Sequence, residues 1–119
     1  MKVLVVDDNK DITDLLSAYF KAKGFDIFTT NDPKKGLELI KEKKYDAILL
    51  DIDMPELSGV DIIETLEREK ILKDQKIHIF SAFAFTTGEI QVLLKKEGIQ
   101  GRLKKPVQFN QLLGAITCG

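Results

Sequence analysis

Five residues in this sequence have the types and the spacing needed for phosphoryl chemistry. Asp7 and Asp8 follow an apolar run typical of a buried strand, and Asp51 ends a second such run. Ser81 and Lys105 follow two later runs. Crowded carboxylates repel one another, so a hard divalent cation such as Mg²⁺ would stabilise them together. With a hydroxyl and an ammonium group beside the cation, these residue types indicate Mg²⁺-assisted phosphorylation of Asp51.

Strands and helices are predicted to alternate along the whole chain, and they would position these five residues. The strands are expected at about 2–6, 26–30, 45–50, 76–80 and 101–104. The helices are expected from a cap at 8–9 to about 23, from Asp32 and Pro33 through the charged run 41–44, at about 60–69, from 86–87 to Gly98, and at about 109–117.

This alternation predicts an α/β fold in which right-handed crossovers build one parallel sheet with helices on both faces. In such a sheet the carboxyl ends of all strands share one edge, where ligands commonly bind. Asp7, Asp8, Asp51, Ser81 and Lys105 each lie at or just past a strand end, so we expect their side chains to converge there.

Length and composition narrow the function classes. At 119 residues we expect one domain spanning 1–119, with no output domain. The net charge is −1, from 18 basic and 19 acidic residues, which argues against direct nucleic-acid binding. No apolar run reaches the roughly 18 residues of a membrane span, and a strand pattern follows Met1 and Lys2 at once, so we expect neither a membrane span nor a signal peptide. The single cysteine, Cys118, fits a reducing compartment, so a cytoplasmic location is expected.

Four motifs in this order carry a resemblance to a known family. They are Val-Asp-Asp after the first strand, Asp51-Ile-Asp-Met-Pro with Gly59 downstream, Ser81-Ala82, and Lys105-Pro106. Each motif alone is weak, but their joint order and spacing are specific. From Lys2 to the final helix the chain resembles the receiver domain of two-component response regulators. The resemblance implies a flavodoxin-like, doubly wound sheet with the strand order 2-1-3-4-5.

The resemblance also implies roles for four aspartates. Asp51 would accept a phosphoryl group from a histidine kinase or a histidine phosphotransfer protein. Asp8 would bind Mg²⁺ directly, Asp7 would act largely through a metal-bound water, and the backbone carbonyl of Asp53 would be a further ligand. Only two carboxylates and one carbonyl would then contact the metal, so weak Mg²⁺ binding is expected.

Three further residues receive roles from the same resemblance. Lys105 would pair with the phosphoryl oxygens, Ser81 would reorient to bond another of them, and the small Ala82 would leave the group room to approach. The domain would not be a conventional enzyme, because it would catalyse only its own phosphorylation and dephosphorylation. Its output would be a changed surface for a partner protein.

The sequence departs from the family pattern at two places. Arg102 stands three residues before Lys105, where the family usually has an aromatic residue, and Phe83 and Phe85 make the loop after Ser81 unusually apolar. A guanidinium is costly to bury, so we expect Arg102 to stay at the surface with its head in water, where it can stack on Phe85. The Phe83–Phe85 loop would then carry the switch.

Two residues have two interpretations each. Ile12, one turn beyond the acidic pair, either docks a phosphodonor protein or belongs to the core. His78 stands between two isoleucines, which favours a packed or edge histidine over a phosphoryl donor.

Other functions compete with the receiver interpretation. A hydrolase of the haloacid dehalogenase type also uses an Asp-x-Asp motif, which Asp51 and Asp53 match, but normally after its first strand. A flavodoxin-like FMN carrier would need a hydroxyl- and glycine-rich phosphate loop in place of the acidic segment after the first strand. A receiver acting only as an unphosphorylated docking module would not need the complete set of five residues.

Overall fold

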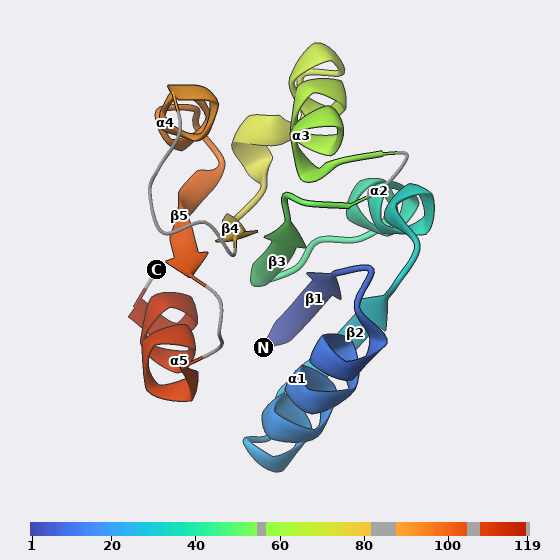
Figure 1. The fold of residues 1–119 in the computed structure, drawn as a ribbon, viewed down its shortest axis with the longest axis vertical. Coiled ribbons are helices and arrows are strands. Elements are labelled where there is room, and N and C mark those ends of the chain that lie inside the picture. The colour runs from blue at the N-terminus through green and yellow to red at the C-terminus, as the bar shows by residue number, and fades with distance from the viewer. Residues whose placement is uncertain (55–56, 82–87, 105–107, 119) are drawn as a thin grey trace.

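The computed structural model of the chain describes residues 1–54, 57–81, 88–104 and 108–118. These residues form five strands that alternate with helices (Figure 1). The strands are β1 (Lys2–Val6), β2 (Asp26–Thr30), β3 (Ala47–Asp51), β4 (Ile77–Ser81) and β5 (Ile99–Lys104). The helices are α1 (Lys10–Ala22), α2 (Pro33–Glu42), α3 (Gly59–Arg68), a 3₁₀ turn η1 (Leu72–Asp74), α4 (Gly88–Leu94) and α5 (Phe109–Cys118).

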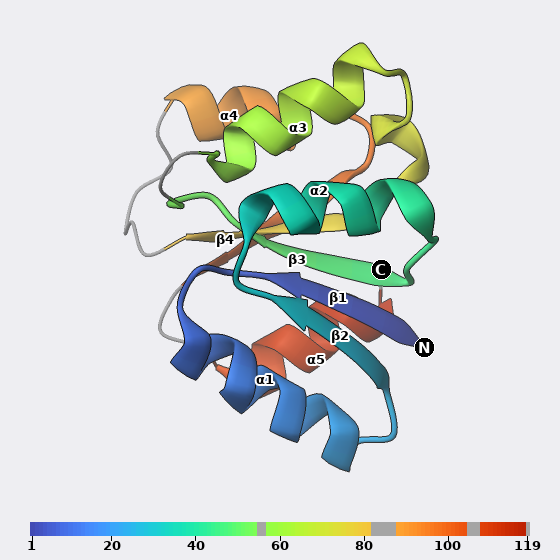
Figure 2. The ribbon, with the colours of Figure 1, turned by 90° about the vertical axis from the view of Figure 1, so that its right-hand side faces the viewer.

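The strands form one parallel sheet in the order β2-β1-β3-β4-β5. Helices α1 and α5 cover one face, and α2, α3 and α4 cover the other (Figure 2). This arrangement confirms the predicted fold class and strand order. It also places the carboxyl ends of β1 and β3 side by side, because these two strands are neighbours in the centre of the sheet.

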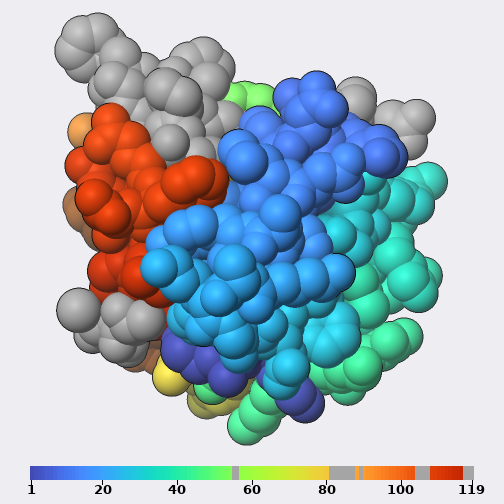
Figure 3. Space-filling view, turned by 90° about the horizontal axis from the view of Figure 1, so that it is seen from below, coloured from blue at the N-terminus to red at the C-terminus, as the bar shows by residue number. Residues whose placement is uncertain are grey.

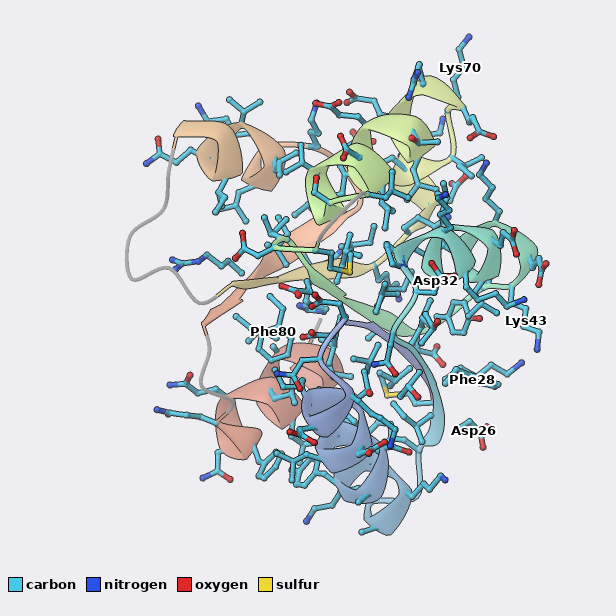
Figure 4. All side chains as sticks on the ribbon, turned by 45° about the vertical axis from the view of Figure 1, so that its right-hand side comes forward. Asp26, Phe28, Asp32, Lys43, Lys70 and Phe80 are labelled. Carbon is cyan, nitrogen blue, oxygen red and sulfur yellow. The ribbon has the colours of Figure 1, made fainter. Side chains whose placement is uncertain are left out.

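Side chains from the two faces of the sheet form two cores. One core packs under α2, α3 and α4, and includes Leu4, Ile48 and Ile79. The other packs under α1 and α5, and includes Val5, Leu49 and Phe80, which points into the layer between the sheet and these helices (Figure 4). Adjacent residues of one strand thus enter opposite cores, which explains why the central strands are continuously apolar in sequence.

Helices α1 and α5 lie side by side on the face seen in Figure 3. Their contact includes the rings of Tyr19 and Phe109, which stack with centroids 4.2 Å apart and an interplanar angle of 9°. Phe20 of α1 meets Tyr19 and Phe25 edge to face. These rings hold α1 in place, and α1 follows directly on the acidic segment after β1.

Polar residues cap the three helices that begin near the carboxyl edge of β1, β2 and β3. Asn9 caps α1 through hydrogen bonds that its side chain accepts from the N–H groups of Asp11 and Ile12. Asp32 caps α2, and Pro33 takes the first helical position, as predicted. Ser58 forms a capping box with Asp61 at the start of α3. None of the described helices is long and apolar enough to cross a membrane.

Several predicted boundaries are wrong by a few residues. The third strand runs from Ala47 to Asp51. Asp46, just before it, bonds Lys2 twice: its N–H donates to the Lys2 carbonyl at 2.8 Å, and its carboxylate accepts from the Lys2 N–H at 2.6 Å. The fifth strand begins at Ile99, and its register with β4 shifts between the pairs Ile77–Ile99 and His78–Gly101, so that Gln100 is an extra residue in β5.

Helix α4 ends at Leu94, well before the predicted stop at Gly98. The following amides bond three residues back, from Lys95 to Val92 at 3.2 Å and from Lys96 to Leu93 at 3.0 Å, so the chain tightens into turns. Val92, which belongs to the apolar pattern of this helix in sequence, is exposed. The predicted loop 71–75 contains η1, which buries Leu72.

His78, the single histidine, is 5% exposed, which confirms that it is a packed residue. Burial lowers the pKa of its imidazole below the ordinary value of 6.5. The unfolded chain therefore binds a proton more readily than the folded chain. The contribution of this neutral side chain to stability is fully present above pH 6.5 and is lost as pH falls towards the lower folded-state pKa.

We therefore expect the free energy of unfolding to decrease below pH 6.5, with a slope of up to about 1.4 kcal/mol per pH unit for the one proton. Urea unfolding between pH 5 and pH 7.5, above the range where most carboxylates titrate, measures this slope. His78→Gln should remove most of it. If the free energy of unfolding falls with pH equally in the wild type and in the variant, the titrating group is not His78.

Candidate functional site

Three carboxylates meet at the carboxyl edge of the sheet. Asp7 and Asp8 follow β1, and Asp51 ends β3, whose Leu50 lies beside Val6 in the ladder. One carboxylate oxygen from each lies within 4.8 Å of the others. Asp7 is 0% exposed and Asp51 is 2% exposed, whereas Asp8 is exposed to solvent. The site is therefore buried on the strand side and open on the Asp8 side.

Backbone amides orient the two buried carboxylates. The N–H of Asn9 donates to Oδ1 of Asp7 at 2.9 Å, and the N–H of Asp53 donates to Oδ1 of Asp51 at 3.1 Å. In each case the donor lies two residues after the aspartate, so the chain turns around the carboxylate directly after the strand. Each of these two side chains is thus held in one orientation by its own loop.

Gly59 allows helix α3 to start close to the end of β3. Its N–H donates to the carbonyl of Ile52 at 3.2 Å, and a Cβ at this position would overlap the backbone of Asp51 and Ile52. The N–H of Ile52 in turn donates to the carbonyl of Phe80 at 3.1 Å, which ties the segment after Asp51 to β4. The glycine of the sequence motif therefore has a steric role next to Asp51.

The donor set fits a hard divalent cation. Three carboxylates placed this close repel one another, and oxygen ligands are those that Mg²⁺ prefers. The exposed position of Asp8 leaves the solvent side open for the water molecules that Mg²⁺ usually retains. Asp53 follows Asp51 closely, and its own side chain is exposed.

The other predicted site residues are only partly described. Ser81 ends β4 beside Lys104 of β5, so its backbone lies at the same sheet edge as Asp51. Ala82, Phe83, Phe85 and Lys105 lie outside the described residues. Their roles stay predictions.

Arg102 differs from its prediction. Its side chain is half-buried, which agrees with a position at the margin of the fold, but its Nε atom is buried, so the expectation of a head in water is wrong for this atom. In the ladder Arg102 lies beside Ile79, which belongs to the core under α2, α3 and α4. Although β5 is an edge strand, Arg102 therefore lies on a face that helices cover.

On α1, Ile12 is half-buried and packs against the core under α1 and α5. Leu15, on the next part of the same helix, is 50% exposed. The apolar side chain that α1 presents most openly to solvent is therefore Leu15, which periodicity alone did not single out.

A hollow of about 320 Å³ lies away from the acidic site, near the amino ends of β4 and β5. Its charged groups already pair in part, since Nζ of Lys96 contacts both carboxylate oxygens of Glu67, at 2.7 and 2.9 Å. The lining residues are Glu67, Lys70, Leu72, Lys73, Lys96 and Glu97. Because these residues lie at the opposite edge of the sheet, the hollow is separate from the carboxylate cluster.

Comparisons with known proteins agree with this geometry. A sequence profile of the response regulator receiver domain matches residues 3–117. The cell cycle transcriptional regulator CtrA of Caulobacter vibrioides is 37% identical over 118 residues, which cover 98% of this chain and 48% of CtrA. The response regulator SaeR of Staphylococcus epidermidis is 34% identical over 115 residues, which cover 93% of this chain and 46% of SaeR. The chain thus spans about half the length of these relatives.

Solved structures show the same fold. The chemotaxis protein CheY4 of Vibrio cholerae superposes with a TM-score of 0.83 at 26% identity, covering 98% of this chain and 96% of that one. The response regulator TrrA of Thermotoga maritima, solved in complex with Mg²⁺ and BeF, gives a TM-score of 0.82 at 26% identity with the same coverage. From the profile match, these relatives and the shared fold, we conclude that the chain belongs to the receiver domain family of two-component response regulators.

Proposed function

We propose that this domain receives a phosphoryl group on Asp51, with Mg²⁺ bound beside it, from a histidine kinase or a histidine phosphotransfer protein. The observation that supports this most strongly is the convergence of the Asp7, Asp8 and Asp51 carboxylates at one sheet edge. Receiver domains act together with histidine kinases, and TrrA, which shares this fold, was solved with Mg²⁺ and BeF.

In the proposed reaction, a carboxylate oxygen of Asp51 attacks the phosphorus atom of the donor. A new O–P bond forms, the bond from phosphorus to the donor imidazole nitrogen breaks, and the electron pair stays on that nitrogen. The hydrogen bond from the Asp53 N–H to Oδ1 keeps the Asp51 carboxylate in one orientation for this attack. Bound Mg²⁺ would neutralise the charge on the phosphoryl oxygens.

The remaining roles follow the family pattern. Asp8 would bind the metal directly, Asp7 through a water molecule, and Asp53 through its backbone carbonyl. Lys105 and Ser81 would contact the phosphoryl oxygens, and Ala82 would leave space for them. With these groups the domain would catalyse both the formation and the hydrolysis of its own aspartyl phosphate.

The test is incubation of the protein with acetyl phosphate and Mg²⁺, followed by intact mass measurement. We expect one phosphoryl adduct per chain, and no adduct when EDTA is present from the start and removes the metal. Continuous release of phosphate from many phosphate esters would instead support a hydrolase of the haloacid dehalogenase type. The absence of any adduct would support an unphosphorylated docking module.

Phosphorylation would act by changing the surface that a partner protein recognises. CtrA is a transcriptional regulator and about twice as long as this chain. Two routes of output are therefore compatible with the receiver function: one through further residues of the same protein, the other through a separate partner protein. The Phe83–Phe85 loop and Arg102 remain the candidates for transmitting the change. We place the domain in the cytoplasm, where histidine kinases present their phosphoryl groups.

The phosphodonor protein should dock on α1. Ile12 and Leu15 are the apolar residues concerned, and Leu15 is the more exposed of the two. We expect Leu15→Ala to slow phosphotransfer from a protein donor about tenfold, since burying a leucine side chain contributes about 1.5–3 kcal/mol and a tenfold change corresponds to about 1.4 kcal/mol. Labelling by acetyl phosphate should not change.

Ile12→Ala provides the comparison for this docking prediction. If Ile12 also contacts the donor, the variant slows only the protein donor; if Ile12 serves the core, both donors slow and the protein loses stability. Rapid-quench assays with the two donors measure both rates. Normal transfer to the Leu15 variant would exclude this part of α1 from the interface.

A further inference from the structure

Asn31, in the turn between β2 and α2, contacts the acidic segment that follows β1. Its Nδ2 donates one hydrogen bond to the backbone carbonyl of Asp7 at 2.9 Å and another to Oγ1 of Thr13 at 2.9 Å. Thr13 is 2% exposed, and its hydroxyl donates to the carbonyl of Lys10 at 3.0 Å. One side-chain amide therefore links the turn after β2 to both ends of the segment 7–13.

The last residue of β2 also holds Asp7, because the N–H of Asp7 donates to the carbonyl of Thr30 at 3.2 Å. Both backbone polar groups of Asp7 are thus bound by residues 30 and 31. Asp8 comes next in the chain, and Asn9 then caps α1. The direction in which Asp8 leaves β1 is accordingly set by two fixed neighbours, Asp7 before it and the capped helix after it.

Asn31 has no capping role that would explain its identity. The cap of α2 is Asp32, labelled at the start of that helix in Figure 4, whose Oδ1 accepts from the Lys34 N–H at 3.0 Å. What the position of Asn31 requires is a nitrogen with two hydrogens, one for a carbonyl and one for a hydroxyl. An ionised aspartate offers only acceptors and an alanine offers neither.

We propose that Asn31 is a positioning residue that orders the acidic segment 7–13 before the divalent cation binds. This inference rests on the proposed function in taking Mg²⁺ as that cation. A segment that is already ordered loses less conformational entropy on binding, so affinity rises without any contact between Asn31 and the metal. Removing the amide leaves all the proposed ligands in the chain but lets the segment that carries them move.

The first measurement is an Mg²⁺ titration followed by amide NMR shifts. Asn31→Ala should weaken Mg²⁺ binding about tenfold, and Thr13→Val, which keeps the bond to Asp7, about two- to threefold. Asp32→Ala is the matched control, because it removes a helix cap from the same turn without touching the acidic segment. Its affinity should stay within about twofold of the wild type.

The second measurement is amide hydrogen exchange without metal. In Asn31→Ala the amide of Asn9, which donates to Asp7, should exchange faster, while in Asp32→Ala the amide of Lys34 should do so instead. Wild-type affinity in Asn31→Ala, or unchanged exchange at Asn9, would overturn the positioning role. If the wild type itself binds no Mg²⁺, the proposed function fails, whereas the exchange result still decides whether Asn31 orders the segment. If Asn31→Ala does not fold, the Thr13→Val titration decides.

Discussion

Replacing Asp51 with asparagine should abolish the phosphoryl adduct while the domain stays folded. The amide cannot attack phosphorus as a carboxylate does, and it keeps the size of the side chain that is buried at the end of β3. Its oxygen can still accept the hydrogen bond from the Asp53 N–H. The change also relieves the repulsion among the three carboxylates, so we expect stability equal to or above that of the wild type.

Intact mass after incubation with acetyl phosphate and Mg²⁺ measures this loss, and urea unfolding checks the fold. Asp53→Asn is the matched control, because its side chain is exposed and only its backbone is assigned a role. That variant should form the adduct at a rate within a few-fold of the wild type. Normal labelling of the Asp51 variant would place the acceptor elsewhere.

Removing the carboxylate of Asp8 should cause the largest loss of metal affinity. Asp8 is the exposed member of the cluster, on the side from which a hydrated ion enters, and it is the proposed direct ligand. We expect Asp8→Ala to weaken Mg²⁺ binding about 100-fold, since both a ligand and a unit of charge are lost. Asp7→Ala should cost about tenfold, because Asp7 acts through water and binds the Asn9 amide.

Titration of each variant with Mg²⁺ ranks the two acids. Asp11→Asn removes a negative charge from the first turn of α1, outside the carboxylate cluster. This variant controls for the electrostatic effect of losing one nearby negative charge without losing a metal ligand. Its affinity should fall by no more than about twofold. A larger loss for the Asp7 variant than for the Asp8 variant would reverse the assignment of direct and water-mediated ligands.

The fold and the convergence of the acids are predictable from sequence because both follow from strand pattern and topology. Apolar runs mark β1 and β3 as buried on both faces, and parallel strands bring their carboxyl ends to one edge. Asp7, Asp8 and Asp51 then have to meet. The caps of α1 and α2 are predictable as well, since Asn9, Asp32 and Pro33 act through local hydrogen bonds or fixed dihedral angles.

Features that depend on contacts between distant segments are not predictable in this way. The bond from Asn31 to Asp7 spans 24 positions, and no local pattern distinguishes this asparagine from an ordinary turn residue. The register shift between β4 and β5 leaves Gln100 as an extra residue, and Nε of Arg102 is buried on a face that helices cover. Helical periodicity places Ile12 and Leu15 on α1, but only packing decides which of them is exposed.

The most direct test of the central claim is chemical identification of the phosphorylated residue. Borohydride reduces an aspartyl phosphate to homoserine, so phosphorylated protein is treated with borohydride, digested and sequenced by tandem mass spectrometry. The account predicts homoserine at position 51 alone, formed only when acetyl phosphate and Mg²⁺ were both present. Homoserine at position 7, 8 or 53, or its absence from a protein that carries a phosphoryl adduct, would contradict it.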